Sequence, residues 1–163
     1  MAGRVAGTTW SEERASSIIS NYRHQRGALL PMLHGLQLEF GCIEDEAILL
    51  LADALNLSRA EVHGVVSFYH DFRRTRPGRH VIKVCRAEAC QAMGANVLLD
   101  HMKSHLSVDV GETTDDGTFT LEAVYCLGNC ALPPALMVDD QLLGRVDISK
   151  FEALVQTCRD DML

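Results

Sequence analysis

Two close pairs of cysteines are the residues of this chain best placed to do chemistry. Four residues separate Cys85 from Cys90, and three separate Cys126 from Cys130. A [2Fe-2S] cluster requires four thiolates, two on each iron, and a short spacing lets one loop supply both sulfurs of one iron. The pattern predicts all four cysteines as iron ligands and the chain as an electron carrier. We assign no side chain as a catalytic acid, base or nucleophile.

Two other kinds of site also use cysteine pairs. Structural zinc takes four cysteines, but its knuckles often stand in short ribbons rather than at the ends of apolar strands. A redox dithiol commonly has two residues between its cysteines, which neither pair here has, and it would leave the second pair without a role. Iron and sulfide are therefore favoured, and a zinc-stabilised docking module is the remote alternative.

The residues around the pairs suit a negatively charged cluster. Gly94 and the tight loop 127–129 are predicted to bring backbone N–H groups close to sulfur, which raises a reduction potential. Arg86 directly follows Cys85 and is either a source of positive charge or a solvated side chain.

Both pairs follow strand patterns. Residues 81–84 are mostly β-branched and end at Cys85, while residues 118–125 alternate between apolar and polar and end at Cys126. A helix opened by Gly94 is predicted between these strands. Later elements are a hairpin of residues 135–138 and 141–146, and a last helix capped by Ser149 with Glu152. This order of elements resembles a thioredoxin-like α/β domain.

The residues before Arg76-Pro77-Gly78 are predicted to be helical. Four helices are expected: one from a Ser11 cap to Gly27, one with Pro31 as its first residue and Gly41 as its C-cap, one over residues 44–55, and one opened by a Ser58/Glu61 capping box. The predicted fold class is α+β, with an N-terminal helical bundle over residues 1–78 and a thioredoxin-like [2Fe-2S] domain over residues 79–163.

Composition excludes several classes of function. The chain has 163 residues, is 47% apolar and carries a formal net charge of −7, with its Lys and Arg residues dispersed, which argues against nucleic acid as a partner. No apolar run approaches the roughly 20 residues that cross a bilayer, so we expect no membrane insertion. Six cysteines without a secretory signal indicate a reducing, cytoplasmic location.

Other residues that bind metals elsewhere have simpler interpretations here. Cys42 and Cys158 fall in helical patterns beside apolar neighbours and are expected to be small buried hydrophobic residues. His101 and His105 have i, i+4 spacing and could hold a metal, but no third ligand of suitable spacing accompanies them, so a solvated face is predicted. His80 is expected to be structural or at the surface.

Several segments together resemble the thioredoxin-like [2Fe-2S] ferredoxin family. These are residues 84–94 (VCRAEACQAMG), 111–114 (GETT), 125–130 (YCLGNC), 27–31 (GALLP), 58–62 (SRAEV) and 64–69 (GVVSFY). That family includes the 24 kDa-type subunit of respiratory complex I and the γ subunit of NAD-dependent, molybdenum-containing formate dehydrogenase. The Arg86-Ala87-Glu88-Ala89 segment is more similar to the formate dehydrogenase subunit.

The resemblance implies an electron-transfer subunit beside a flavin- and NAD-binding subunit and, through it, a molybdenum subunit that oxidises formate. An equivalent subunit of complex I or of an NAD-reducing hydrogenase is the alternative. FMN, NAD and the molybdenum cofactor would belong to partner subunits. The sequence agrees, because it has no G-x-G-x-x-G turn between a strand and a helix and no G-x-x-x-x-G-K loop. The helical part, which lacks chemistry of its own, is the expected docking surface.

Overall fold

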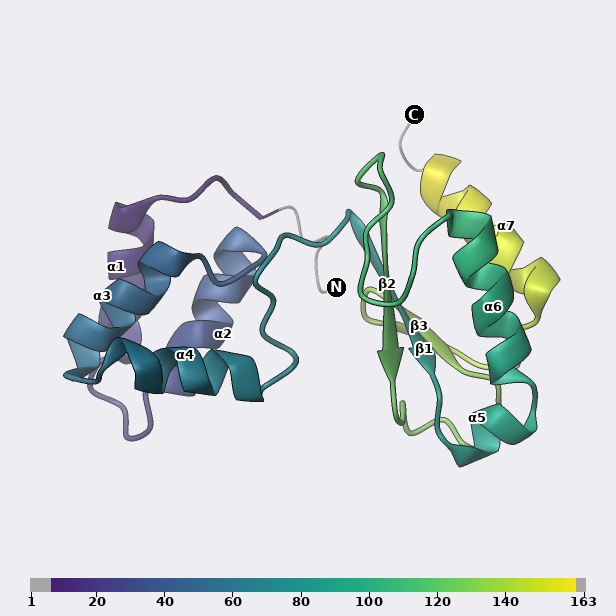
Figure 1. Cartoon of the computed structure of the whole chain (residues 1–163), viewed down its shortest axis with the longest axis horizontal. Coiled ribbons are helices and arrows are strands. Elements are labelled where there is room, and N and C mark those ends of the chain that lie inside the picture. Colours follow the sequence, from purple (N-terminus) through teal and green to yellow (C-terminus); the bar gives the residue numbers. More distant parts are fainter. Residues whose placement is uncertain (1–6, 161–163) are drawn as a thin grey trace. The chain divides into compact units, whose positions relative to one another are not determined.

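The computed structural model describes residues 7–160, which form two compact units that meet in the sequence at Arg76 and Pro77 (Figure 1). Each unit has its own hydrophobic core. None of the helices within residues 7–160 has the length and apolar character needed to cross a bilayer.

The first unit consists of helices. They are α1 (Glu12–Tyr22), α2 (Leu29–Phe40), α3 (Asp45–Leu55) and α4 (Arg59–Phe68). Their apolar faces meet in one core, whose largest fully buried side chains are Met32, Leu33, Leu36, Phe40, Ile43 and Leu51. Cap residues mark where these helices begin and end: Ser11 accepts a hydrogen bond from the Arg14 N–H at the start of α1, and Gly41 adopts the left-handed C-cap of α2.

The predicted capping box of α4 is confirmed. The Glu61 N–H donates to Ser58 Oγ at 3.2 Å, and the Ser58 N–H donates to Glu61 Oε2 at 2.8 Å. Two helix limits differ from the prediction. Helix α1 ends at Tyr22 rather than at Gly27, and α2 begins at Leu29, so that Pro31 is its third residue. A proline is tolerated there because the N–H groups of a first turn have no partner within the helix.

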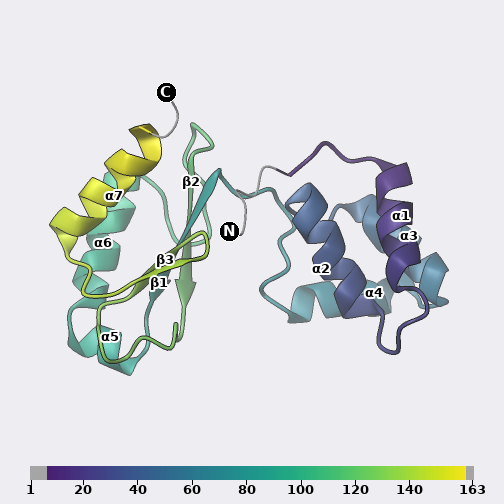
Figure 2. The same cartoon turned by 180° about the vertical axis from the view of Figure 1, so that it is seen from behind.

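The second unit is a four-stranded sheet with helices packed on one face (Figures 1 and 2). Its elements are β1 (His80–Cys85), α5 (Glu88–Ala92), α6 (Ala95–Leu106), β2 (Phe119–Val124), β3 (Leu136–Val138), β4 (Gln141–Leu143) and α7 (Ile148–Asp160). The strand order is β2-β1-β3-β4. Helices α6 and α7 bury Leu98, Met102 and Phe151 against strand residues such as Ile82 and Leu121.

The predicted α+β class and the thioredoxin-like order of elements are confirmed, with α5 added. β1 pairs with β2 in parallel, and β3 pairs with β1 and with β4 in antiparallel. The hairpin turns at residues 139–140 as predicted, although β4 ends at Leu143 rather than at Val146.

The start of α7 differs from the prediction of a Ser149/Glu152 capping box. Asp147 Oδ1 instead accepts hydrogen bonds from the Lys150 N–H and from the Ser149 hydroxyl, both at 2.8 Å. These bonds hold the pKa of Asp147 below its usual range. A carboxylate at the N-terminus of a helix is also favoured by the helix dipole, so Asp147 outcompetes Ser149 as the cap. Glu152 is thereby left free to face another element.

Candidate metal centre

The first cysteine pair is buried among apolar side chains at the end of β1. Cys85 is the last residue of that strand, and the short helix α5 carries Cys90 back toward it. Both side chains are almost fully buried, with 2% and 1% exposure, and they pack with Ala95 and Ala135. Such an apolar wall excludes water from the two thiols.

The second pair lies in an exposed loop after β2. The Sγ atoms of Cys126 and Cys130 are 4.0 Å apart. Gly128, between them, has a φ of 73°, a left-handed conformation that glycine adopts without strain, and its N–H donates to Cys126 Sγ at 3.3 Å. The predicted approach of the Gly128 loop to sulfur is therefore confirmed.

The parallel pairing of β1 with β2 brings the two loops to one end of the sheet. Cys85 is in register with Val124, and Cys126 follows two residues later. In Figure 1 both strands run toward the end at which α5 lies. The Arg86 N–H donates to the Val124 carbonyl at 2.7 Å, which ties the first loop to the end of β2.

Neighbouring thiols affect the ionisation of two of the four cysteines, Cys90 and Cys130. Burial raises the pKa of Cys90; a backbone hydrogen bond from Ala135 opposes this rise, while the nearby Cys85 and Cys130 add to it. The hydrogen bond and the charge of Cys126 raise the pKa of Cys130, and Cys85 contributes in the same direction. Thus Cys130 interacts with members of both pairs, which the spacing of the sequence could not establish.

This donor set fits a [2Fe-2S] cluster. Two sulfurs bound to one tetrahedral metal at about 2.3 Å lie about 3.8 Å apart, close to the separation of the Cys126 and Cys130 sulfurs. The buried pair and the exposed pair could each serve one iron. A negatively charged cluster also requires donors, and the Gly128 and Ala135 N–H groups already point at sulfur.

The segment that directly follows β4 packs against the exposed loop. The Arg145 N–H donates to the Leu132 carbonyl at 2.8 Å. Gly144 lies so close to this loop that an added Cβ would approach Leu132 Cβ and Asn129 Nδ2 to 2.7 Å. Glycine at this position therefore lets the hairpin pack tightly against the segment that carries Cys130.

Other residues highlighted by the sequence have different outcomes. Arg86 is half-buried, and its Nε atom is buried without a hydrogen-bond partner, so it is not a freely solvated side chain. The expectation for Gly94 was wrong, because its N–H donates to the Gln91 carbonyl at 3.0 Å, while its φ of 89° starts α6. His80 is structural, since it is buried and its Nδ1 lies 3.0 Å from Asp139 Oδ2.

The remaining cysteines lie outside the site. Cys42 is buried as expected, although it lies in the connection between α2 and α3 rather than in a helix, and burial raises its pKa. Cys158 lies on α7 and is half-buried. Residues 7–160 contain all six cysteines, and none of them forms a disulfide.

Sequence reasoning missed two neighbours, one beside the cysteines and one beside the histidines of α6. The Ala135 N–H reaches Cys90 only because β3 pairs beside β1, and nothing local to Ala135 signals such a role. Glu152 on α7 lies beside His101 and His105, a neighbour that the sequence did not reveal.

A model of the family described as thioredoxin-like [2Fe-2S] ferredoxin matches residues 15–159. The chain belongs to this family. The cofactor of these ferredoxins is a [2Fe-2S] cluster, as the four cysteines predict. The resemblance inferred from the cysteine loops is thus confirmed at the level of the family; a particular closeness to formate dehydrogenase is not shown.

Relatives of this ferredoxin occur under more than one name. An NADH-quinone oxidoreductase subunit of Mycobacterium tuberculosis (strain ATCC 25618 / H37Rv) is 36% identical over 92% of this chain and 60% of its own length, so the chain spans about 60% of that relative. The subunit of the same name in Aquifex aeolicus is 39% identical over 85% of this chain and 82% of its own length. The HndA subunit of the NADP-reducing hydrogenase of Solidesulfovibrio fructosivorans is 36% identical, with coverages of 78% and 75%.

A solved structure supports the fold of this ferredoxin. The crystal structure of an NAD+-reducing [NiFe]-hydrogenase in the H2-reduced state matches with a TM-score of 0.71 and 24% sequence identity. The match covers 81% of this chain and 22% of the hydrogenase chain. This likeness concerns the fold alone.

Proposed function

We propose that this chain is a one-electron transfer subunit whose [2Fe-2S] cluster is held by Cys85, Cys90, Cys126 and Cys130. When bound, such a cluster accepts and releases a single electron. The observation that carries the proposal is the meeting of two cysteine loops at neighbouring parallel strand ends, where Cys130 of one loop lies close enough to affect the ionisation of Cys90 of the other.

The two pairs would contribute differently. Cys85 and Cys90 anchor the buried side, where apolar neighbours exclude water. Cys126 and Cys130 form the exposed side, next to Tyr125, which is 74% exposed. An exposed aromatic residue beside the second pair offers apolar area to a partner at the point where an electron would cross.

We propose a flavin- and NAD-binding subunit as that partner, because a one-electron carrier is useful beside a cofactor that also handles two-electron hydride chemistry. Formate dehydrogenase is the assembly that the Arg86-Ala87-Glu88-Ala89 segment supports, with the molybdenum subunit reached through the flavin subunit. The names of the relatives support the alternative, an NADH-quinone oxidoreductase or an NAD(P)-linked hydrogenase. In each case FMN, NAD and any molybdenum cofactor would lie on other subunits.

The helical unit is the proposed docking surface for this partner. An apolar groove on it is lined by Leu29, Leu57, Val65 and Phe68. Phe68 is 73% exposed, so its ring offers apolar area at the edge of this groove.

The ligand assignment is tested on anaerobically purified protein. Cys130→Ser should weaken or abolish the visible iron–sulfur absorption, whereas Cys42→Ser, outside the site, should leave it intact. Acid-labile sulfide and an electron paramagnetic resonance signal after dithionite reduction distinguish the cluster from zinc, which is colourless and silent. An unchanged spectrum of Cys130→Ser, with full iron and sulfide, would refute the assignment.

The choice of assembly requires a separate experiment. The tagged chain is purified from its native cells, and its partners are identified by mass spectrometry with metal analysis. Copurification of molybdenum with formate-dependent NAD reduction supports formate dehydrogenase. Recovery in a membrane complex that oxidises NADH, or with a nickel-containing subunit, would instead establish one of the alternatives.

A further inference from the structure

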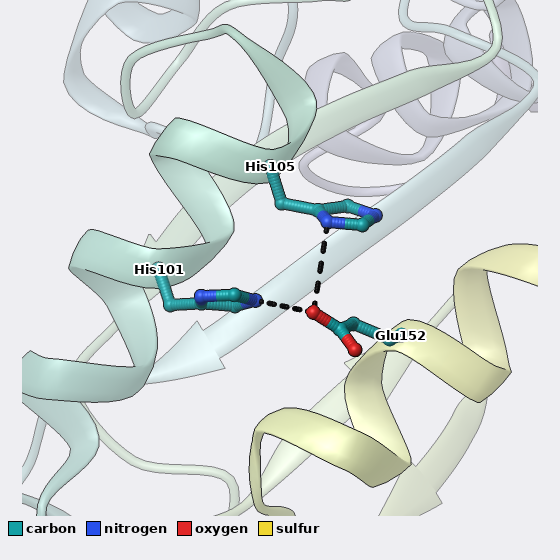
Figure 3. Close-up of side chains that lie close together, drawn as sticks. All are labelled: His101, His105 and Glu152. Atoms are coloured by element: carbon teal, nitrogen blue, oxygen red, sulfur yellow. Dashed lines mark hydrogen bonds and ion pairs between the residues drawn. The ribbon is translucent and has the colours of Figure 1, made fainter.

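Two histidines and a glutamate converge on one point between α6 and α7 (Figure 3). His101 Nε2 lies 3.0 Å from Glu152 Oε1, and His105 Nδ1 lies 3.9 Å from the same oxygen. The histidines are one helical turn apart on α6, and Glu152 reaches them from α7. One ligand atom from each of the three residues lies within 4.8 Å of the other two.

The two imidazole rings are held in place by packing. Their centroids are 5.7 Å apart and their planes differ by 31°. Both rings meet the Phe151 ring edge to face, at 6.3 Å for His101 and 5.7 Å for His105. Phe151 is fully buried, so its ring position is fixed and packing against it restricts both imidazole rings.

Glu152 is available because Asp147 caps α7. Within residues 7–160, the ionic partners of Glu152 are the two histidines. A neutral histidine can donate one hydrogen bond to this carboxylate, which accounts for the contact of His101. It does not account for a second ring nitrogen directed at the same oxygen from 3.9 Å, too far for a hydrogen bond.

The separations suit one tetrahedral metal ion. Nitrogen and oxygen ligands at about 2.0–2.1 Å from Zn²⁺ lie about 3.3 Å apart, between the two distances measured here. Two histidines and a glutamate are a known ligand type for zinc, with water in the fourth position. All three side chains are partly exposed, so an ion has a path from solvent.

We propose that His101, His105 and Glu152 form a second metal site, which binds a divalent transition metal of the Zn²⁺ class and joins α6 to α7. The site is separate from the four cysteines and uses nitrogen and oxygen ligands alone. Bound Zn²⁺ links the two helices that cover one face of the sheet, and it stabilises the folded state because the unfolded chain lacks the preformed site.

The proposal is tested by calorimetric titration of Zn²⁺ into the cluster-loaded chain, with the cluster absorption followed throughout so that loss of the cluster to zinc is detected. One Zn²⁺ should bind per chain with the absorption unchanged. His105→Gln and Glu152→Gln should each weaken Zn²⁺ binding by roughly tenfold or more. Mutation of residues that only hydrogen-bond to metal ligands already lowers metal affinity about 10–100-fold, and these two variants remove a ligand itself. His24→Gln, an exposed histidine in the other unit, is the matched control and should have no effect.

His105→Gln is the decisive variant. It leaves the His101–Glu152 hydrogen bond in place but removes one metal ligand, so it separates a metal site from a simple polar contact. Thermal unfolding followed by circular dichroism should show a higher midpoint with Zn²⁺ in the parent chain and in His24→Gln, but not in His105→Gln, and no rise with Mg²⁺. Absence of Zn²⁺ binding, or binding unchanged in His105→Gln and Glu152→Gln, would overturn the proposal.

Discussion

The two cysteine loops begin at the same end of the sheet but are built in opposite ways. The first is closed: α5 folds Cys90 back onto Cys85, and small apolar residues surround both sulfurs. The second is open: Cys126 and Cys130 lie in an exposed loop shaped by a left-handed glycine. The four proposed ligands thus lie in an asymmetric environment, in which one pair is buried and the other is exposed to solvent.

The largest expected effect is the loss of a buried ligand. Cys90→Ser should lower the iron content per chain by roughly tenfold or more, because mutation of residues that only contact metal ligands already lowers metal affinity about 10–100-fold. The loss of iron should be larger than in Cys130→Ser. Water has no access to replace a missing ligand at Cys90, whereas it can at the exposed Cys130. Iron and sulfide per chain are measured after identical anaerobic purification of both variants. Equal amounts in the two variants would contradict the different roles of the buried and the exposed pair.

Alkylation of the cluster-free chain should rank the thiols in the same way. Iodoacetamide followed by peptide mass spectrometry should label Cys126 and Cys130 well before Cys85 and Cys90. Because Cys126 raises the pKa of Cys130, labelling of Cys130 should accelerate as the pH rises toward that raised value, where the reactive thiolate forms. Equal labelling of both pairs under folded conditions, verified by circular dichroism, would contradict the structural asymmetry.

A smaller effect is expected from crowding the support of the open loop. In Gly144→Ala the new Cβ would overlap Leu132 and Asn129, so the free energy of unfolding should fall by about 1–3 kcal/mol and iron occupancy should decrease. Urea unfolding and iron analysis measure both quantities. Gly64→Ala on α4, where an added Cβ meets nothing within 4 Å, is the control and should retain full iron.

The smallest effect concerns charge. Arg86→Gln should lower the reduction potential by roughly 30–60 mV, which corresponds to at most a tenfold change in the equilibrium constant of one-electron reduction. The reason is that the half-buried cation next to Cys85 stabilises the more negatively charged reduced state. Arg159→Gln makes the same charge change near the far end of α7 and should shift the potential less. Potentiometric titration of both variants decides; an equal shift would show that overall charge, not the position of Arg86, matters.

The parts of the fold that local signals determine were predictable from the sequence. The strand pattern that ends at Cys85 matches β1, and Ser58 with Glu61 marked the start of α4. The second strand was also predicted, although β2 ends at Val124 rather than directly before Cys126. Helix α5 was missed because its five residues are too few for a helical repeat of apolar positions to show in the sequence. The α7 cap was misassigned because Asp147 and Ser149 are both good caps, and the chain geometry selects between them.

The candidate site was less predictable where it depends on contacts distant in sequence. Spacing alone suggested the four cysteines as ligands, but the burial of one pair and exposure of the other follow from α5 and from the packing of Ala95 and Ala135. Glu152 could be placed beside the α6 histidines only after α7 had been positioned on the sheet.

The parallel pairing of β1 with β2 has a consequence for biogenesis. During synthesis the first cysteine pair leaves the ribosome with α6 and all of β2 still to follow, so the nascent chain offers only two of the four proposed site sulfurs until β2 and the loop after it have been made. Delivery of iron and sulfide to the proposed site must then come after the sheet has closed. Cluster insertion would therefore be a late step in maturation, and a chain in which β1 and β2 have not paired would not acquire a cluster.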